Sequence, residues 1–154
     1  MILPAMGAIT EIITTFSHRT VFGYKAIAMS SLAIAFVGYL VWGHHMFMSG
    51  MNPFLGSVFT FTTLLIAIPS AVKAFNYITT LWKGNLQLNP AMLFSIGLVS
   101  TFITGGLTGI ILGDSTLDIN VHDTYFVIAH FHLVMGISAL YGMFAGIYHW
   151  FPKM

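Results

Sequence analysis

Seven histidines carry most of the chemistry that this 154-residue sequence offers. Two of them are adjacent, His44 and His45, and two are separated by a single residue, His130 and His132. Neutral imidazole is a good ligand for copper, zinc and iron. The chain contains no cysteine, so it offers no thiolate zinc site, iron–sulfur ligands or disulfide. The two histidine pairs are therefore the first candidates for metal centres.

The spacing within each pair predicts a different geometry. Neighbouring side chains on a helix point about 100° apart, so His44 and His45 can both reach one metal ion that lies between them. Residues two apart differ by about 200°, so the rings of His130 and His132 leave opposite faces and can bind two different centres. Satisfied core histidines are the alternative for the first pair. Close helix packing explains the glycines near the second pair, but it does not explain the histidines.

A second polar group precedes the helix that carries His130. It contains Asp118, His122 and Asp123. A histidine beside a carboxylate can hold a hard divalent ion such as Mg²⁺ or Mn²⁺. The alternative is that Asp123 and Thr124 form an ordinary helix N-cap. The two remaining histidines, His18 and His149, are interpreted as surface residues at the membrane interfaces.

These histidines belong to a chain with the composition of a membrane protein. Charged residues make up 6% and apolar residues 57%, whereas a soluble domain carries about 25% charged residues to cover its surface. The same numbers argue against disorder, and a net charge of +1 argues against nucleic-acid binding. We expect an all-α, polytopic transmembrane helical bundle formed by one membrane segment, residues 1–154. Four full spans are predicted near residues 24–43, 53–81, 91–112 and 126–150, after a partial N-terminal helix.

The loop charges predict how the bundle is oriented. Arg19, Lys83 and Lys153 lie in alternate loops or at the end of the chain, so the positive-inside rule places that side toward the cytoplasm or its mitochondrial equivalent. The loop that contains Asp123 then faces outward. Pro69 lies inside the second predicted span, where its ring and missing N–H should kink the helix.

Lys73 breaks the pattern of the loop charges. It lies about 12 Å inside the inner end of its predicted helix, a depth at which an ionisable group is a functional candidate. Its neighbours within about 60° on the helix wheel are Thr62, Ser70, Tyr77 and Thr80. This polar stripe indicates a proton or ion path toward the inner side. A snorkelling lysine, or one that seals a helix contact, is the alternative.

Three stretches of sequence resemble subunit I of the haem–copper terminal oxidases, and cytochrome c oxidase most of all. They are Val41–Phe47 (VWGHHMF), Ala67–Lys73 (AIPSAVK) and Leu117–His132 (LDINVHDTYFVIAHFH). The resemblance covers essentially the whole chain, which is similar to the end of the sixth family helix and to helices seven to ten. It implies a catalytic subunit that reduces O₂ to water and couples this reaction to proton translocation.

The resemblance also implies roles for individual residues. His44 and His45 correspond to copper ligands, His130 to the axial ligand of a high-spin haem, and His132 to an axial ligand of a low-spin haem. His122 and Asp123 correspond to a magnesium (or manganese) site shared with subunit II. The other implied roles are those of Asp118, near the haem propionates, and of Lys73, Ser70 and Thr10, on a proton uptake path.

Several features of the family are absent from these 154 residues. They include the third copper ligand with its cross-linked tyrosine, the second axial ligand of the low-spin haem and the second proton path. We therefore expect a split subunit, a truncated reading frame or a fragment that functions with the remaining part of subunit I, subunit II and subunit III. The implied electron donor is cytochrome c, with a quinol as the alternative. The implied location is a bacterial plasma membrane or a mitochondrial inner membrane. An alternative of another class is a non-catalytic membrane module or ion carrier.

Overall fold

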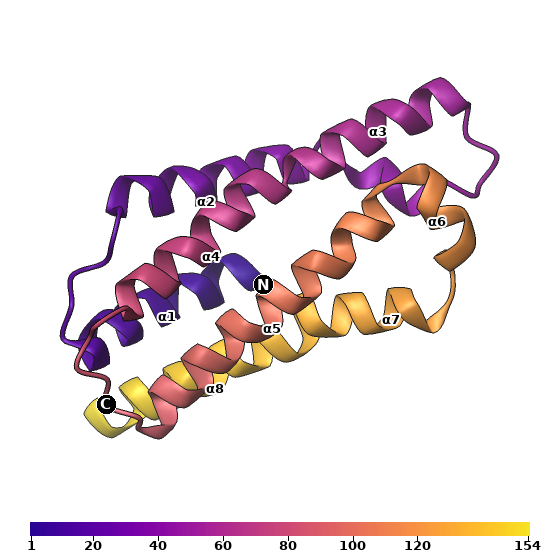
Figure 1. The fold of residues 1–154 in the computed structure, drawn as a ribbon. Helices are drawn as coiled ribbons and strands as arrows, with labels where there is room; N and C mark the ends of the chain where they lie inside the picture. Colours follow the sequence, from indigo (N-terminus) through magenta and orange to yellow (C-terminus); the bar gives the residue numbers. More distant parts are fainter.

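The computed structural model describes residues 1–154, and its regular elements are all helical. The predicted all-α fold is therefore confirmed. Figure 1 shows the elements as an elongated bundle. In chain order they are α1 (Ile2–Ser17), α2 (Tyr24–Gly38), a 3₁₀-helix (Trp42–Met46), α3 (Pro53–Leu65), α4 (Ala67–Leu81), α5 (Pro90–Gly113), α6 (Ser115–Val121), α7 (Tyr125–Phe131), a π-helix (His132–Ile137), α8 (Ser138–Trp150) and a final 3₁₀ turn (Phe151–Lys153).

Three helical segments are long and apolar enough to cross a membrane: Pro53–Leu81, Pro90–Gly113 and Tyr125–Lys153. The stretch predicted as a span at residues 24–43 is different, because α2 ends at Gly38. The N–H groups of Tyr39 and Leu40 donate to carbonyl groups three residues back, which tightens the last turn and ends the helix. The 3₁₀-helix that follows carries the adjacent histidines.

The predicted kink at Pro69 is present as a break between α3 and α4. Ile66 lies between the two helices and caps both of them. Its N–H donates to the Thr63 carbonyl oxygen, three residues back, at 3.1 Å. Pro69 has no N–H with which to continue the pattern. Thr62 therefore lies on α3, and its hydroxyl donates to the α3 carbonyl groups of Val58 and Phe59.

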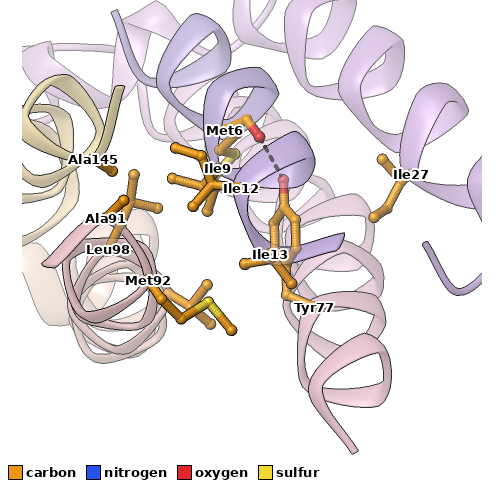
Figure 2. Close-up of a cluster of buried hydrophobic side chains, with 11 residues drawn as sticks. Met6, Ile9, Ile12, Ile13, Ile27, Tyr77, Ala91, Met92, Leu98 and Ala145 are labelled. Atoms are coloured by element: carbon orange, nitrogen blue, oxygen red, sulfur yellow. Dashed lines mark hydrogen bonds between the residues drawn. The ribbon is translucent and has the colours of Figure 1, made fainter. Parts of the chain in front are cut away.

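Helix α1 lies at the centre of the buried core. Figure 2 shows its side chains Met6, Ile9, Ile12 and Ile13 between residues of α2, α4, α5 and α8. A Cβ atom on Gly142 of α8 would lie 2.5 Å from the Cβ of Ala5, so the two helices approach closely through a small residue. Such contacts are typical of helix packing in membranes.

The loops divide between the two ends of the bundle. The connections at residues 18–23 and 82–89 lie at the same end as the C-terminus, and those at 39–52 and 114–124 lie at the other (Figure 1). Arg19, Lys83 and Lys153 therefore share one end, and Asp123 lies at the opposite end. The structure thus places these charged residues at the ends that the predicted topology requires. We call the two ends the inner and the outer end.

Candidate metal and cofactor site

A cavity of about 610 Å³ lies among the 3₁₀-helix, α3, α4, α5, α6 and α7. Its volume is within the range of about 300–1,000 Å³ that is common for ligand pockets. It gathers seven of the predicted site residues from distant parts of the sequence. They are His44, His45, Ser70, Asp118, His122, Asp123 and His130. Thr10, Lys73 and His132 do not line this cavity.

His44 and His45 point their Nε2 atoms at each other, 3.0 Å apart. The other ring nitrogen of His44, Nδ1, lies 3.1 Å from the hydroxyl oxygen of Thr63. Two nitrogens that each lie about 2.0 Å from one ion can be at most about 4 Å apart, so the pair can bind a single metal ion. The side chains thus fit a copper ion, for which imidazole is a preferred ligand. The tight 3₁₀ backbone brings the two rings together.

His130 reaches the same cavity from α7 and is held by α5. Its Nδ1 lies 2.9 Å from the carbonyl oxygen of Gly105 and 3.0 Å from the Thr108 hydroxyl. A carbonyl oxygen can only accept, so Nδ1 carries the proton, and in the neutral ring Nε2 keeps a free lone pair. A Cβ atom on Gly109 would lie 2.9 Å from the His130 Cε1. The missing side chain at Gly109 therefore leaves room for the ring, which fits an axial ligand to haem iron.

His132 lies on the other side of its helix and is exposed. Its Nδ1 donates to the carbonyl oxygen of Ile128 at 2.8 Å, which again leaves the Nε2 lone pair free. The π-helix begins at His132, and such wide turns are frequent at functional sites. The Ser138 hydroxyl donates to the Leu133 carbonyl oxygen five residues back. This side chain satisfies one of the carbonyl groups within the wide turn.

His122 is oriented by Asp118 at the outer end of the cavity. Its Nδ1 lies 2.7 Å from Asp118 Oδ2, and Asp118 is buried. The His122 Nε2 lies 3.9 Å from Asp123 Oδ1 on a side chain that is 94% exposed. These two atoms can contact one ion, but no three residues of the His, Cys, Asp and Glu types form a metal-binding group in the chain. The N-cap of α7 is Thr124, whose hydroxyl accepts from the Phe126 N–H, and not Asp123.

Lys73 is only 2% exposed and has no hydrogen bond or ion pair within the chain. Ser70 lies one turn before it and lines the cavity. Thr10 is on α1, where its hydroxyl contacts the Tyr77 hydroxyl at 2.9 Å. The three residues predicted for proton uptake thus lie on two packed helices, α4 and α1.

His149 differs from the prediction that it is a surface residue, because it is 4% exposed. It packs between α1 and α8, with its ring edge-on to Phe16 and to Trp150. Its Nε2 accepts from Lys153 Nζ at 2.9 Å and lies 3.9 Å from Glu11. The apolar surface of α1 covers this histidine. His18 is exposed, as predicted.

Sequence reasoning missed the residues that hold the histidine rings. These are Thr63 for His44, and Thr108 and the Gly105 carbonyl group for His130. Threonines are common in apolar helices, so their sequence positions carry no signal for this role. The Asp118–His122 contact is different, because its i,i+4 spacing can be found in the sequence.

A bundle of apolar helices that surrounds a cavity with anchored histidines belongs to the class of membrane proteins that can bind metals and cofactors. Comparison with known proteins gives the family. The family model described as "Cytochrome C and Quinol oxidase polypeptide I" matches residues 1–154, and the chain belongs to this family. It is therefore related to the membrane oxidoreductases of the respiratory chain.

Individual relatives carry the same description. The chain is 54% identical to "Cytochrome c oxidase subunit 1" of Thermostichus vulcanus and 52% identical to the protein of that name in Synechocystis sp.. It is 45% identical to "Alternative cytochrome c oxidase subunit 1" of Bradyrhizobium diazoefficiens. These alignments cover 99–100% of this chain and 26–28% of the relatives. The chain thus spans about a quarter of the length of the curated relatives that it matches.

Proposed function

We propose that this chain forms part of the catalytic subunit of a terminal respiratory oxidase. The proposed reaction is the reduction of O₂ to water with electrons from cytochrome c, coupled to proton translocation. The relatives named above are all described as cytochrome c oxidases, which favours this donor over a quinol. The family description includes both donors, so a quinol oxidase is the second candidate.

One observation carries the proposal. The adjacent histidines His44 and His45 and the single His130 line the same cavity, although they come from separate segments of the chain. Each has one ring nitrogen held by an oxygen of the protein, or a partner ring within hydrogen-bond distance. A merely structural role for these histidines, as in an ion carrier or a passive module, does not require their nitrogens to converge on a cavity.

The residues fit the groups that the family implies. His44 and His45 would hold copper, His130 the high-spin haem, and His132 the low-spin haem on the opposite side of the helix. When bound, these groups would supply the binding of O₂ and the electrons that reduce it. The protein anchors His44, His130 and His132 through Nδ1, and such anchoring orients a ligand and raises its basicity. Gly106 and Gly109 line the α5 side of the cavity without side chains of their own.

The outer part of the site would hold a hard ion. We propose that His122 and Asp123 contribute to a magnesium (or manganese) site, which needs further ligands from water or from subunit II. Asp118 orients His122 and is proposed to lie near the haem propionates. The Asp118 carboxylate is buried and bonded to His122, which supports a role for it beside the groups that this part of the site would hold.

Proton uptake is proposed to use the inner half of α4. Lys73 is buried among apolar helices and can carry a proton, because its amine has one lone pair when neutral. Ser70 lies between Lys73 and the cavity along the helix, and Thr10 lies on the neighbouring α1. The remaining part of subunit I, subunit II and subunit III are the proposed protein partners, in a bacterial plasma membrane or a mitochondrial inner membrane.

Optical spectroscopy of the purified membrane complex tests this function. We expect oxidase-type haem bands, with the high-spin bands lost in His130→Ala and the low-spin bands lost in His132→Ala. His18→Asn is the matched control, because His18 is exposed and distant from the cavity, and it should keep the wild-type spectrum. A complex that binds no haem in any of these forms would overturn the proposal.

A further inference from the structure

The span that carries His132 contains one irregular turn, which a side chain closes. Residues His132–Ile137 form the π-helix, a turn in which a carbonyl group pairs with the residue five positions ahead instead of four. The Ser138 N–H donates to the Met135 carbonyl oxygen, three residues back. The Ser138 hydroxyl donates to the Leu133 carbonyl oxygen, five residues back, at 2.5 Å. The side chain of Ser138 therefore makes a contact with the spacing of the wide turn.

Helix α5 supports this side chain. Ser138 is fully buried, and its Oγ lies 2.7 Å from Oγ1 of Thr101 on α5. Because a carbonyl oxygen can only accept, the Ser138 proton is directed to Leu133, and Thr101 is the donor to Ser138. The other acceptors near Thr101 are farther away, the carbonyl oxygens of Gly97 at 3.0 Å and Leu98 at 3.1 Å. Thr101 and Ser138 thus form a chain from α5 to the backbone of the wide turn, and we call this pair the hydroxyl clamp.

A glycine one turn further along α5 brings the two backbones together. A Cβ atom on Gly105 would lie 2.6 Å from Val134 Cγ2 and 3.0 Å from the Val134 backbone nitrogen. The missing side chain lets the wide turn lie directly against α5, as small residues do in membrane helix packing. The Gly105 carbonyl oxygen also accepts from His130 Nδ1 at 2.9 Å. Helix α5 therefore contacts this span on both sides of His132, at His130 and at the wide turn.

The two histidines of this span differ in what holds their rings. His130 is anchored by α5, through the Gly105 carbonyl group. His132 is exposed, and its ring contacts come from its own span, where Nδ1 donates to the Ile128 carbonyl oxygen and the ring stacks on Phe131. The direction of the His132 ring therefore depends on the backbone that carries it, and the wide turn begins at His132 itself.

We propose that Thr101 and Ser138 are positioning residues for His132. The hydroxyl clamp fixes the wide turn and thereby sets the direction in which the His132 ring faces its haem. This inference rests on the proposed function, in which His132 is an axial ligand of the low-spin haem. Axial ligands are one of the means by which a protein sets the potential of a haem. The clamp therefore acts on the low-spin haem and leaves the high-spin haem at His130 unaffected.

The competing explanation is that the clamp only fastens α8 to α5. Both explanations predict that loss of either hydroxyl group lowers stability, because a buried polar group loses its partner. Only a positioning role predicts that the signal of the low-spin haem changes while that of the high-spin haem does not. The experiment therefore observes the two haems separately, in the resting complex and without turnover.

The test uses the complete purified complex with Ser138→Ala, Thr101→Val, Thr101→Ser and the double variant Ser138→Ala/Thr101→Val. Two matched controls carry the same kinds of change away from the wide turn. Ser95→Ala removes a fully buried hydroxyl group that donates to a carbonyl group of its own helix, α5. Thr104→Val changes an exposed threonine of α5 whose hydroxyl also donates within the helix.

Electron paramagnetic resonance and a redox titration of each haem are the measurements. We expect Ser138→Ala and Thr101→Val to shift the g values of the low-spin haem, because these values depend on the direction of its axial imidazole rings. We also expect the equilibrium constant for reduction of this haem to change at least about threefold, which is about 28 mV at about 59 mV per tenfold change for one electron. The signal of the high-spin haem and the haem content should stay at the wild-type level.

Two further readouts separate positioning from a structural contact. Thr101→Ser keeps a hydroxyl group and should restore the wild-type g values, and the double variant should shift them no further than Ser138→Ala, because the two hydroxyl groups act in series. Amide hydrogen exchange at residues 132–137, followed by mass spectrometry, should be faster in Ser138→Ala than in Ser95→Ala. Thr101→Val leaves Ser138 in place, so it tests the proposal if Ser138→Ala does not assemble.

Three results would overturn the positioning role. The low-spin g values and potential of Ser138→Ala and Thr101→Val could match those of the two controls, Thr101→Ser could fail to restore the signal, or the signals of both haems could change together. Haem stays bound in each of these results. Failure of the proposed function itself would instead appear as a wild-type complex without haem.

Discussion

The Nε2 atoms of His44 and His45 lie 3.0 Å apart, while Nδ1 of His44 lies 3.1 Å from the Thr63 hydroxyl oxygen. Two Nε2 lone pairs that face each other repel unless a proton or a metal ion lies between them. One nitrogen can donate an N–H to the other, or both can bind one ion. The second arrangement fits the cavity that the pair lines, and it leads to a direct measurement.

Replacement of either histidine should remove copper from the complex. We expect His44→Ala and His45→Ala to lower the ratio of copper to haem sharply, because a single imidazole cannot replace a converging pair of ligands. Thr63→Val keeps both ligands but removes the contact to Nδ1, and should weaken copper binding by about 10–100-fold, as the loss of other outer-shell partners does. Metal analysis by mass spectrometry, with haem measured in the same sample, gives the ratio. An unchanged ratio in both alanine variants would contradict the assignment.

A glycine on α5 sets the position of the His130 ring. A Cβ atom at Gly109 would lie 2.9 Å from the ring Cε1, so Gly109→Ala should push the ring away from the Gly105 carbonyl group. Overpacking of this kind costs about 1–3 kcal/mol. We expect a lower content of high-spin haem or a shifted absorption band in the purified complex. Gly38→Ala is the control, because a Cβ atom there meets nothing within 4 Å. If Gly109→Ala has the same spectrum as Gly38→Ala, the ring is not confined by α5.

The sequence predicted the helical elements because apolar length and helix breakers act locally. Pro69 interrupts a helix through its own ring, so the break at Ile66 is visible without tertiary structure. The opposite directions of His130 and His132 follow in the same way from the helical angle. The end of α2 at Gly38 was not predicted, because the apolar stretch continues beyond it to Val41 and Trp42.

Other features depend on contacts that the sequence does not reveal. His149 is buried because α1 packs over it, although it lies next to interfacial residues in the sequence. No sequence pattern distinguishes the π-helix at His132–Ile137 from an ordinary α-helix. The Thr108 hydroxyl contacts His130 only because α5 packs beside α7. The residues of the candidate site were thus visible in the sequence, but the groups that contact their side chains required the fold.

The N-cap of α6, Asp114, makes the stability of the outer loop depend on pH. Asp114 Oδ1 accepts from the hydroxyl of Thr116 at 2.5 Å and from its N–H at 2.9 Å. The hydrogen bond from the Thr116 hydroxyl, followed by that from its N–H, lowers the pKa of Asp114 below the ordinary value. A lowered pKa in the folded state means that the carboxylate stabilises the fold above the ordinary pKa and that this stabilisation is lost as the pH falls through the folded pKa.

Two substitutions at Asp114 separate the stability that comes from its N-cap hydrogen bonds from the pH dependence that comes from its charge. Asp114→Ala removes the acceptor and should lower stability by about 1 kcal/mol near neutral pH, the usual value for an N-cap. Asp114→Asn keeps an acceptor without a titrating charge, so it should retain most of the stability and lose this part of the pH dependence. Thermal unfolding of the complex between about pH 3 and pH 7 measures both effects, a range that brackets the ordinary aspartate pKa. Equal pH dependence in wild type and Asp114→Asn would show that the carboxylate does not contribute.

Lys73 provides the most direct test of proton uptake. Lys73→Met keeps a long, flexible side chain in the buried site but cannot carry a proton, so packing should change little. We expect reduction of the oxygen-binding haem to slow by about 10²-fold or more, because a positioned proton-transfer group is lost, while haem and copper contents stay constant. Rapid-mixing spectroscopy follows the two haems separately. Lys25→Met is the matched control, because Lys25 is exposed at the inner end of α2 and should leave the rate unchanged. A wild-type rate in Lys73→Met would mean that the protons for this step reach the cavity by a route that does not include Lys73.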